Sequence, residues 1–262
     1  MLLTCSLVTK AWLARSRRHL FNKITLNGDR AKKWCSTFRP GQNGVSNLVR
    51  TLRLQQTPQG HPWLDTKSLD AISDHFSSFQ YVENLSFTGV DLSSFEPGSL
   101  ARNFLHHGPS LRSLDLFSAS ANYSALSTFL QLFPNLKVLY IHDPTLCDDN
   151  PPLSISRTAP IFHGSLKLSL FNSVSSPFIS HLAGLDLRFS SIFLFRCDFS
   201  SGLPLTNLLE GSALSLRHLQ LDCVTFCEFF LSPFRRSHTT HQPTSQLSVL
   251  TCPSCGAKSS TT

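Results

Sequence analysis

The sequence predicts an α/β fold in which short parallel strands alternate with helical return segments and stack as a solenoid over residues 45–231. Three observations predict it. A short apolar pattern recurs at a nearly constant spacing, amphipathic stretches lie between its copies, and 262 residues with a hydrophobic content of 41% suffice to bury a sizeable core. An ordinary α/β domain with coincidental leucine spacing is the alternative.

The recurring pattern is apolar-x-x-Leu-x-apolar. Its clear copies read VRTLRL, VENLSF, LRSLDL, LKVLYI and LRHLQL, and its weaker copies read SLKLSL and SIFLFR. Because side chains alternate across a strand, the apolar residues of each copy point to one side, and parallel stacking joins them into one core. A unit that begins L-x-x-L-x-L and repeats at this period is typical of leucine-rich repeats. The central leucines, 25 to 33 residues apart, are Leu52, Leu85, Leu114, Leu139, Leu168, Leu194 and Leu219.

Three return segments have the apolar spacing of helices, over residues 68–79, 98–108 and 122–133. We expect Asn122 to cap the third helix and Pro134 to end it. The apolar stripes of the three segments consist of Leu69, Ile72, Phe76 and Phe79, of Leu100, Phe104 and Leu105, and of Leu126, Phe129, Leu130 and Phe133.

The sixth strand has two candidates, LAGLDL over residues 182–187 and SIFLFR over residues 191–196. We place the strand at 191–196, because this choice keeps the repeat spacing near 26 residues and leaves SPFISHLAGL as a return helix.

The positive charge is concentrated in the N-terminal fifth of the chain. Residues 1–53 carry a net charge of +10, whereas the whole chain carries +7. Such a segment suits an acidic protein partner or a nucleic acid, or it is only a solvated surface. An N-terminal mitochondrial targeting peptide is a further alternative, because Arg15, Arg17, Arg18 and Lys23 precede the first acid, Asp29.

The stretch LLTCSLVTKAWLARSRRHLFNKITL resembles the C-terminal half of an F-box, most closely that of divergent fungal F-box proteins with irregular leucine-rich repeats. The resemblance covers residues 1–26, lacks the N-terminal half of the module, and implies a small helical remnant followed by a linker over residues 27–44. In that family the module docks on an acidic Skp-type adaptor. The matching positions are Leu3, Cys5, Ser6, Leu7, Val8, Lys10, Trp12, Arg17, Leu20 and Phe21.

The resemblance implies that Leu3, Leu7, Val8, Lys10 and Trp12 bind the adaptor. Leu3, Leu7 and Val8 share one helical face that Trp12 continues, whereas Lys10 lies on the exposed side. The same helices could instead only cap the first repeat.

The expected function is that of a protein-interaction adaptor, a substrate-receptor-like subunit of a Skp–cullin–F-box ubiquitin ligase in the cytoplasm or nucleus. The x positions of the repeats would hold the target protein, and Arg53, Arg112 and Tyr140 are the residues we expect to bind it, because Arg and Tyr often dominate interfaces. A stand-alone leucine-rich-repeat scaffold, a basic N-terminal nucleic-acid-binding protein and a merely solvated sheet face are the alternatives.

Enzyme motifs do not occur in the sequence: it has no phosphate-binding loop, dinucleotide-binding glycine pattern, HExxH motif or nucleophile elbow. We therefore expect no catalytic residue, metal, cofactor or small-molecule substrate. No apolar run approaches 18 residues, so no membrane contact is expected.

The C-terminal cysteines leave one question open. Cys252 and Cys255 have the spacing of half a zinc ribbon, and Cys223 and Cys227 would have to supply the other half. The surrounding residues 232–262 are rich in Ser and Thr and have little to bury, so we expect this tail to be disordered.

Overall fold

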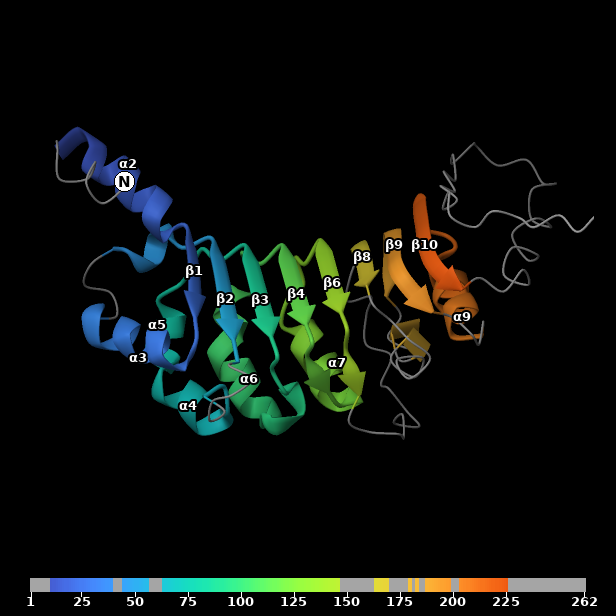
Figure 1. The fold of residues 1–262 in the computed structure, drawn as a ribbon, viewed down its shortest axis with the longest axis horizontal. Helices are drawn as coiled ribbons and strands as arrows, with labels where there is room; N and C mark the ends of the chain where they lie inside the picture. The colour runs from blue at the N-terminus through green and yellow to red at the C-terminus, as the bar shows by residue number, and fades with distance from the viewer. Residues whose placement is uncertain are drawn as a thin grey trace, which may run out of the picture.

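One open parallel sheet organises the chain, and the order of its strands in space follows their order in the sequence (Figure 1). The computed structural model describes residues 10–39, 44–56, 63–146, 163–169, 179–180, 182–183, 187–198 and 203–225. In these residues the sheet consists of β1 (Lys23–Leu26), β2 (Thr51–Gln55), β3 (Asn84–Thr88), β4 (Ser113–Phe117), β6 (Val138–His142), β8 (His163–Ser169), β9 (Arg188–Asp198) and β10 (His218–Thr225). The predicted α/β class with parallel strands is confirmed.

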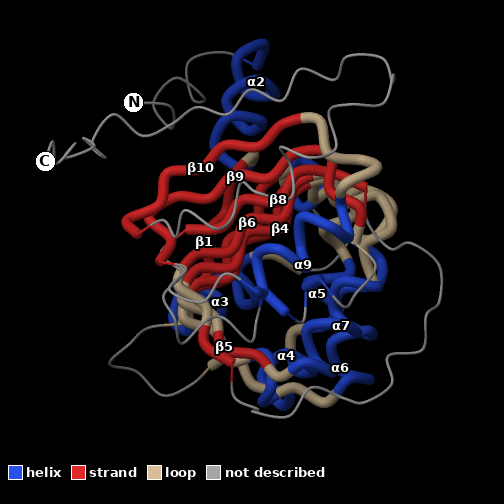
Figure 2. The backbone as a smooth tube through the Cα atoms, turned by 90° about the vertical axis from the view of Figure 1, so that its right-hand side faces the viewer, coloured by secondary structure: helices blue, strands red, loops and turns tan. Residues whose placement is uncertain are grey.

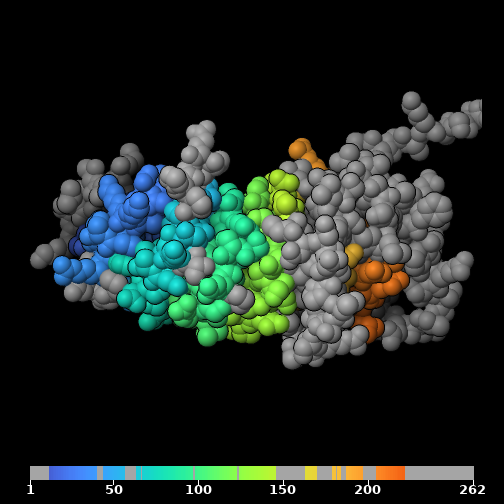
Figure 3. Space-filling model, turned by 90° about the horizontal axis from the view of Figure 1, so that it is seen from below, coloured from blue at the N-terminus to red at the C-terminus, as the bar shows by residue number. Residues whose placement is uncertain are grey.

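Helices line one face of this sheet, where the end-on view of Figure 2 shows α4 to α7 and α9. The space-filling view from below shows the coloured segments following one another in chain order (Figure 3). The helices are α2 (Lys10–Phe21), α3 (Gly28–Thr37), α4 (Thr66–Ala71), α5 (Ser73–Ser77), α6 (Pro97–Phe104), α7 (Tyr123–Gln131) and α9 (Leu203–Ser212). Three short 3-10 helices, η1 (Ser46–Leu48), η2 (Leu92–Ser94) and η3 (Leu105–His107), and a small sheet of β5 (Ser120–Ala121) and β7 (Thr145–Leu146) complete the described elements.

The pairing register aligns two rows of buried apolar side chains on the face of the sheet that the helices cover. Five of the seven predicted central leucines lie in the first row. This row consists of Ile24, Leu52, Leu85, Leu114, Leu139, Leu166, Ile192 and Leu219, and the second of Leu26, Leu54, Phe87, Leu116, Ile141, Leu168, Leu194 and Leu221.

The predicted alignment of the two weaker copies is wrong by two residues. Leu166, and not Leu168, pairs with Leu139, and Ile192 continues that row in β9. A shift of two residues keeps every side chain on the same face, so the alternation of apolar residues cannot exclude it. The strand itself was placed correctly: residues 191–196 lie within β9, whereas Leu182 is a buried helical residue.

The sheet begins one strand earlier than predicted. Residues 23–26, which the F-box resemblance assigns to a helical module, form β1 and pair with β2. The expected linker over residues 27–44 contains α3, because the Asn27 side chain accepts a hydrogen bond from the Arg30 backbone N–H at 3.0 Å and caps the helix. The buried Ala31 and the half-buried Trp34 then pack α3 against the core.

The return helices form where predicted, with two differences. The segment over 68–79 divides into α4 and α5 at Ile72, although Leu69, Phe76 and Phe79 are buried as expected. In the next segment Leu105 is 59% exposed, because α6 ends at Phe104 and the chain tightens into η3. In the third, the Asn122 side chain caps α7 by accepting from the Ala125 N–H at 2.7 Å.

Phenylalanines join the sheet to its helices in one chain of ring contacts. Phe104 of α6 lies with its ring centroid 5.5 Å from Phe87 of β3 and 5.7 Å from Phe129 of α7. Phe129 in turn lies 5.1 Å from Phe133. We call Phe76, Phe79, Phe87, Phe104, Phe129 and Phe133, all at most 1% exposed, the phenylalanine core.

A residue in the left-handed backbone conformation, with a positive φ angle, follows several strands at equivalent positions. Gly89, Ser118 and Asp143 come directly after β3, β4 and β6, and their φ angles are 65°, 46° and 49°. Their N–H groups continue the ladder, for example Ser118 N to His142 O at 2.8 Å. The same turn therefore follows these three strands, although only the first uses glycine. Arg196, with a φ angle of 51°, lies within β9, where the pairing with β10 shifts register.

Candidate functional site

The helix-free side of the sheet, which we call the open face, carries three parallel rows of side chains set by the register. In the residues that the structure describes, no helix packs on this side (Figure 2). The rows are Thr51, Asn84, Ser113, Val138, Ser165, Ser191 and His218; Arg53, Ser86, Asp115, Tyr140, Lys167, Phe193 and Gln220; and Gln55, Thr88, Phe117, His142, Ser169 and Phe195.

A carboxylate lies between two cations in the middle row. Asp115 has Arg53 two strands away on one side and Lys167 two strands away on the other. Burial raises the pKa of Asp115, whereas a hydrogen bond from Ser113 Oγ at 3.1 Å and the charges of Arg53 and Lys167 lower it. Desolvation is the largest of these causes, so the carboxylate is already partly withdrawn from water.

Aromatic side chains gather beside this carboxylate. Tyr140 lies 5.1 Å from Phe117 and 6.2 Å from His142 between ring centroids, and both contacts are edge-to-face. Phe193 and Phe195 stack at 6.4 Å, and the Lys167 ammonium lies 5.7 Å from the Phe193 ring centroid. We call Phe117, Tyr140, His142, Phe193 and Phe195, all half-buried, the aromatic patch.

Two of the three residues expected to bind a partner lie on the open face. Arg53, which is exposed, and Tyr140, which is half-buried, share the middle row. Arg112 does not lie on the open face, because β4 begins at Ser113 and Arg112 precedes the strand; its expected role in partner binding stays a prediction. Its guanidinium donates instead to the Asn135 carbonyl at 3.4 Å, at the edge of the sheet.

The residues expected to bind an adaptor are only partly covered by the structure. Leu3, Leu7 and Val8 lie outside the described residues, and Lys10 begins α2. Trp12 on α2 is 54% exposed. Figure 1 shows α2 extending away from the first strand of the sheet. Its exposed side chains include Arg15, Arg17 and Arg18.

Sequence reasoning missed most of the aromatic patch. Phe117 and His142 lie one residue beyond the six-residue pattern, on the same side as its polar positions. Lys167 and Phe193 stand at x positions of the two weaker copies, and the prediction chose its binding residues from the clear copies alone. Extending the alternation by one residue past each strand pattern would have found Phe117 and His142.

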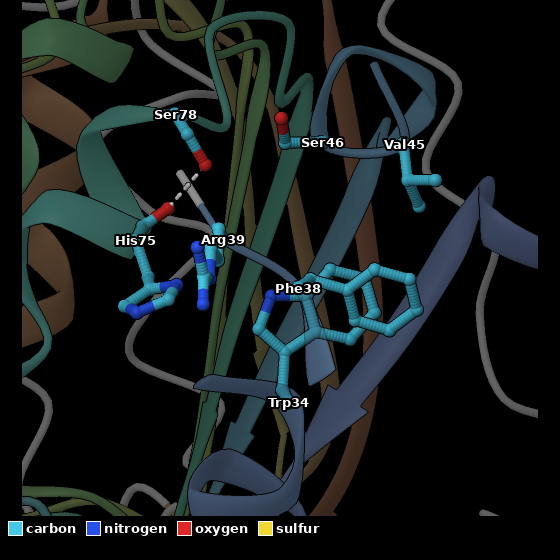
Figure 4. A pocket seen from close by; sticks show the side chains of 7 residues that line it. All are labelled: Trp34, Phe38, Arg39, Val45, Ser46, His75 and Ser78. Atoms are coloured by element: carbon cyan, nitrogen blue, oxygen red, sulfur yellow. Dashed lines mark hydrogen bonds between the residues drawn. The ribbon is translucent and has the colours of Figure 1, made fainter. Parts of the chain in front are cut away.

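Two other features are structural rather than functional. The hollow in Figure 4, lined by Trp34, Phe38, Arg39, Val45, Ser46, His75 and Ser78, has a volume of about 10 Å³ and holds at most one water. His107 is fully buried beside His106, with ring centroids 3.9 Å apart. Burial, helped by the charge of His106, lowers the pKa of His107 to about 3, so its ring is a neutral part of the core.

Most of the cysteines that could form the zinc site lie outside the described residues. Cys227, Cys252 and Cys255 are not described, and of Cys223 only its place in β10 is known. In the described ranges, no three His, Cys, Asp or Glu side chains come together as a metal site. The same ranges contain no helix with the length and apolarity that crossing a membrane requires.

Comparison with known proteins identifies no family: no family model matches the chain, and no curated protein matches its sequence. The inference of function therefore starts from the open face and from α2.

Proposed function

We propose that the chain is a non-enzymatic adaptor, built as a leucine-rich-repeat-like solenoid, that holds a target protein on its open face. The observation that carries this proposal is the middle row, where Asp115 stands between Arg53 and Lys167 next to the aromatic patch. Large half-buried aromatics are an interaction surface of the kind that dominates binding energy in protein interfaces.

The solenoid part of the proposal is supported by the repeated geometry. Each strand of the eight-stranded sheet pairs in parallel with the next strand of that sheet in sequence order, and the equivalent left-handed turn follows β3, β4 and β6. A stack of this kind presents one continuous sheet face, and such extended faces are what repeat proteins use for binding.

The ligase part of the proposal rests on the F-box resemblance of residues 1–26. The exposed Trp12 and the basic side chains of α2 supply an anchor and a complementary charge for an acidic Skp-type adaptor. The proposed complex would work in the cytoplasm or nucleus, and the chain would position its target without making or breaking bonds.

Binding of a purified Skp-type adaptor to the full chain tests the ligase link. We expect complex formation that Trp12→Ala weakens at least about tenfold, because interface tryptophans often carry 2 kcal/mol or more. The matched control is Tyr81→Ala, which removes a 48% exposed aromatic three residues before β3. Failure of the wild-type chain to bind refutes the link and leaves the stand-alone scaffold.

The target site is tested with the double substitution Tyr140→Ser and Phe193→Ser. We expect these changes to abolish recovery of the protein partners that the wild-type chain retains, and Ser124→Ala with Gln131→Ala, both exposed on α7, to leave recovery unchanged. Equal recovery with both double variants, at equal folded fraction by circular dichroism, would refute the open face as the binding site.

Nucleic-acid binding through α2 is the second candidate. Its exposed arginines, Arg15, Arg17 and Arg18, precede any acidic residue in the chain. Association with an oligonucleotide that weakens steeply with rising salt, and that Arg17→Gln with Arg18→Gln removes, would favour this function over adaptor binding.

A further inference from the structure

Basic residues lie at the N-terminal ends of several sheet strands, the end from which every strand arrow starts in Figure 1. Arg112 and Lys137 directly precede β4 and β6, Arg188 begins β9, and Arg217 directly precedes β10. We call these four residues, all exposed, the basic edge. No ion pair within the described ranges engages them.

At β2 and β3 the corresponding charges are paired. Arg50, which precedes β2, lies 3.6 Å from the Glu83 carboxylate, which precedes β3. The Arg50 guanidinium also lies 5.0 Å from the centroid of the Tyr81 ring. This pair separates the exposed Lys23, which begins β1, from the basic edge, which extends from β4 to β10.

A groove of about 680 Å³ lies within the basic edge, at the starts of β8, β9 and β10. Among the lining residues that the structure describes, the ionisable ones are His163, Arg188, Arg217 and His218, and none is a carboxylate. The sheet register holds these groups together: His163 pairs with Arg188, and the Arg217 N–H donates to the Ser190 carbonyl at 2.8 Å.

Two serine hydroxyls of the groove are already engaged. Ser190 Oγ donates to the Gly164 carbonyl at 3.2 Å, and Ser215 Oγ donates to the Phe189 carbonyl at 3.0 Å. The charged and ring donors of the lining are guanidinium and imidazole groups, which favour an anion.

The described part of the groove also offers an apolar contact. Leu214 is 104% exposed on its wall, and none of the lining residues that the structure describes is aromatic. Single-stranded nucleic acids are held by aromatic stacking, which these described residues do not supply. A leucine between cations instead fits a peptide that alternates acidic and apolar side chains.

We propose that the basic edge and its groove bind an acidic peptide segment of a partner protein. Adjacent strands are about 4.8 Å apart, so the edge from β4 to β10 spans about 19 Å, the length of roughly six extended residues. The inference deepens the proposed function and rests on it for the statement that the ligand belongs to a protein.

The test measures binding of a fluorescent peptide of about eight residues, rich in glutamate with two leucines, to the full chain. We expect binding that Arg188→Gln with Arg217→Gln weakens at least about tenfold. Lys32→Gln with Lys33→Gln removes the same charge from α3 and is expected to leave the affinity unchanged. All four residues are exposed, so neither double variant disturbs the core.

Two more probes sharpen the test. Leu214→Ser is expected to weaken the peptide about threefold, and replacing the glutamates of the peptide by glutamine is expected to abolish binding. Equal weakening by the Arg188/Arg217 and the Lys32/Lys33 double variants would overturn the proposal, as would an oligonucleotide that displaces the peptide more strongly than unlabelled peptide does.

The outcome separates this inference from the proposed function. If the acidic peptide does not bind while Tyr140→Ser with Phe193→Ser still removes the partners, the inference fails and the adaptor function stands. If the peptide binds at the groove while those open-face changes have no effect, the inference stands and the open face is not the target site.

Discussion

The repeats of β2 to β6 and those of β8 to β10 differ in regularity and in where their aromatic side chains lie. In the first region every sheet strand has five residues and the register is uniform. In the second the strands have 7, 11 and 8 residues, and the register shifts between Gly164 and Ser165 and again in β10.

The difference lies in how the phenylalanines are shared between the core and the open face. In the first region Phe87 and Phe129 fill the core between sheet and helices, whereas Phe117 lies on the open face. In β9 Phe189 is buried, whereas Phe193 and Phe195 lie on the open face. We infer that the first region supplies most of the phenylalanine core and that the aromatic patch is built by both regions.

Replacing one phenylalanine of each region by alanine is expected to give the largest difference in unfolding free energy. We expect Phe129→Ala to lower the free energy of unfolding by about 3–5 kcal/mol, because the ring is fully buried and leaves a cavity. Phe193→Ala, at a half-buried position on the open face, is expected to cost about 1 kcal/mol. Urea denaturation measures both changes in unfolding free energy. Equal losses would contradict the assignment of Phe129 to the core and of Phe193 to the open face.

Acid is expected to destabilise the first region through its buried histidine. The pKa of His107 in the fold, about 3, is below its unfolded value of 6.5, so the unfolded chain binds the proton first as pH falls. The stability is complete above pH 6.5 and falls by on the order of 4 kcal/mol towards pH 3.

His107→Phe removes this titration and should flatten the profile of unfolding free energy against pH, measured with urea. The exposed His163 and His218 of the second region serve as controls, and their replacement by glutamine should leave the profile unchanged. A wild-type profile that is flat between these pH values would disprove the role of His107.

A glycine at the junction of η3 and the next strand tests how closely the first region packs. A Cβ atom at Gly108 would lie 2.5 Å from the Leu132 carbonyl oxygen, so Gly108→Ala is expected to cost about 2–3 kcal/mol. At Gly98 a Cβ meets nothing within 4 Å, and Gly98→Ala is the matched control. Thermal unfolding that shifts equally in both variants would contradict this packing.

The smallest effect is expected at the repeated left-handed turn. Ser118→Gly and Asp143→Gly should raise the unfolding free energy by about 0.5 kcal/mol each, because glycine adopts a positive φ without strain. Gly89→Ala should lower it by about 1 kcal/mol. Loss of stability on Ser118→Gly would show that the turn is not strained.

The sequence predicted the regular region well because three signals coincide there. Leucine pattern, amphipathic return and capping residue all agree for Leu114, Asn122 and Leu139. β1 was missed because KITL lacks the first half of the pattern, although Ile24 and Leu26 occupy both buried rows. A strand is defined by its neighbours as much as by its own residues.

The candidate site was harder to predict than the fold. Arg53 and Tyr140 follow from alternation alone, but Arg112 required knowing where β4 begins. The groove depends on His163, Arg188 and Arg217, which are far apart in the sequence and meet only through the register of three strands. No local sequence pattern predicts that these residues lie close together.

Photocrosslinking tests the central claim, that the open face holds a protein partner, most directly. A photoreactive phenylalanine analogue would replace Tyr140 in one chain and the exposed Gln131 of α7 in another. We predict a covalent adduct with a second protein from position 140 that is lost when Phe193→Ser is added, and no such adduct from position 131. Adduct formation from position 131 at an equal or greater yield would contradict the account.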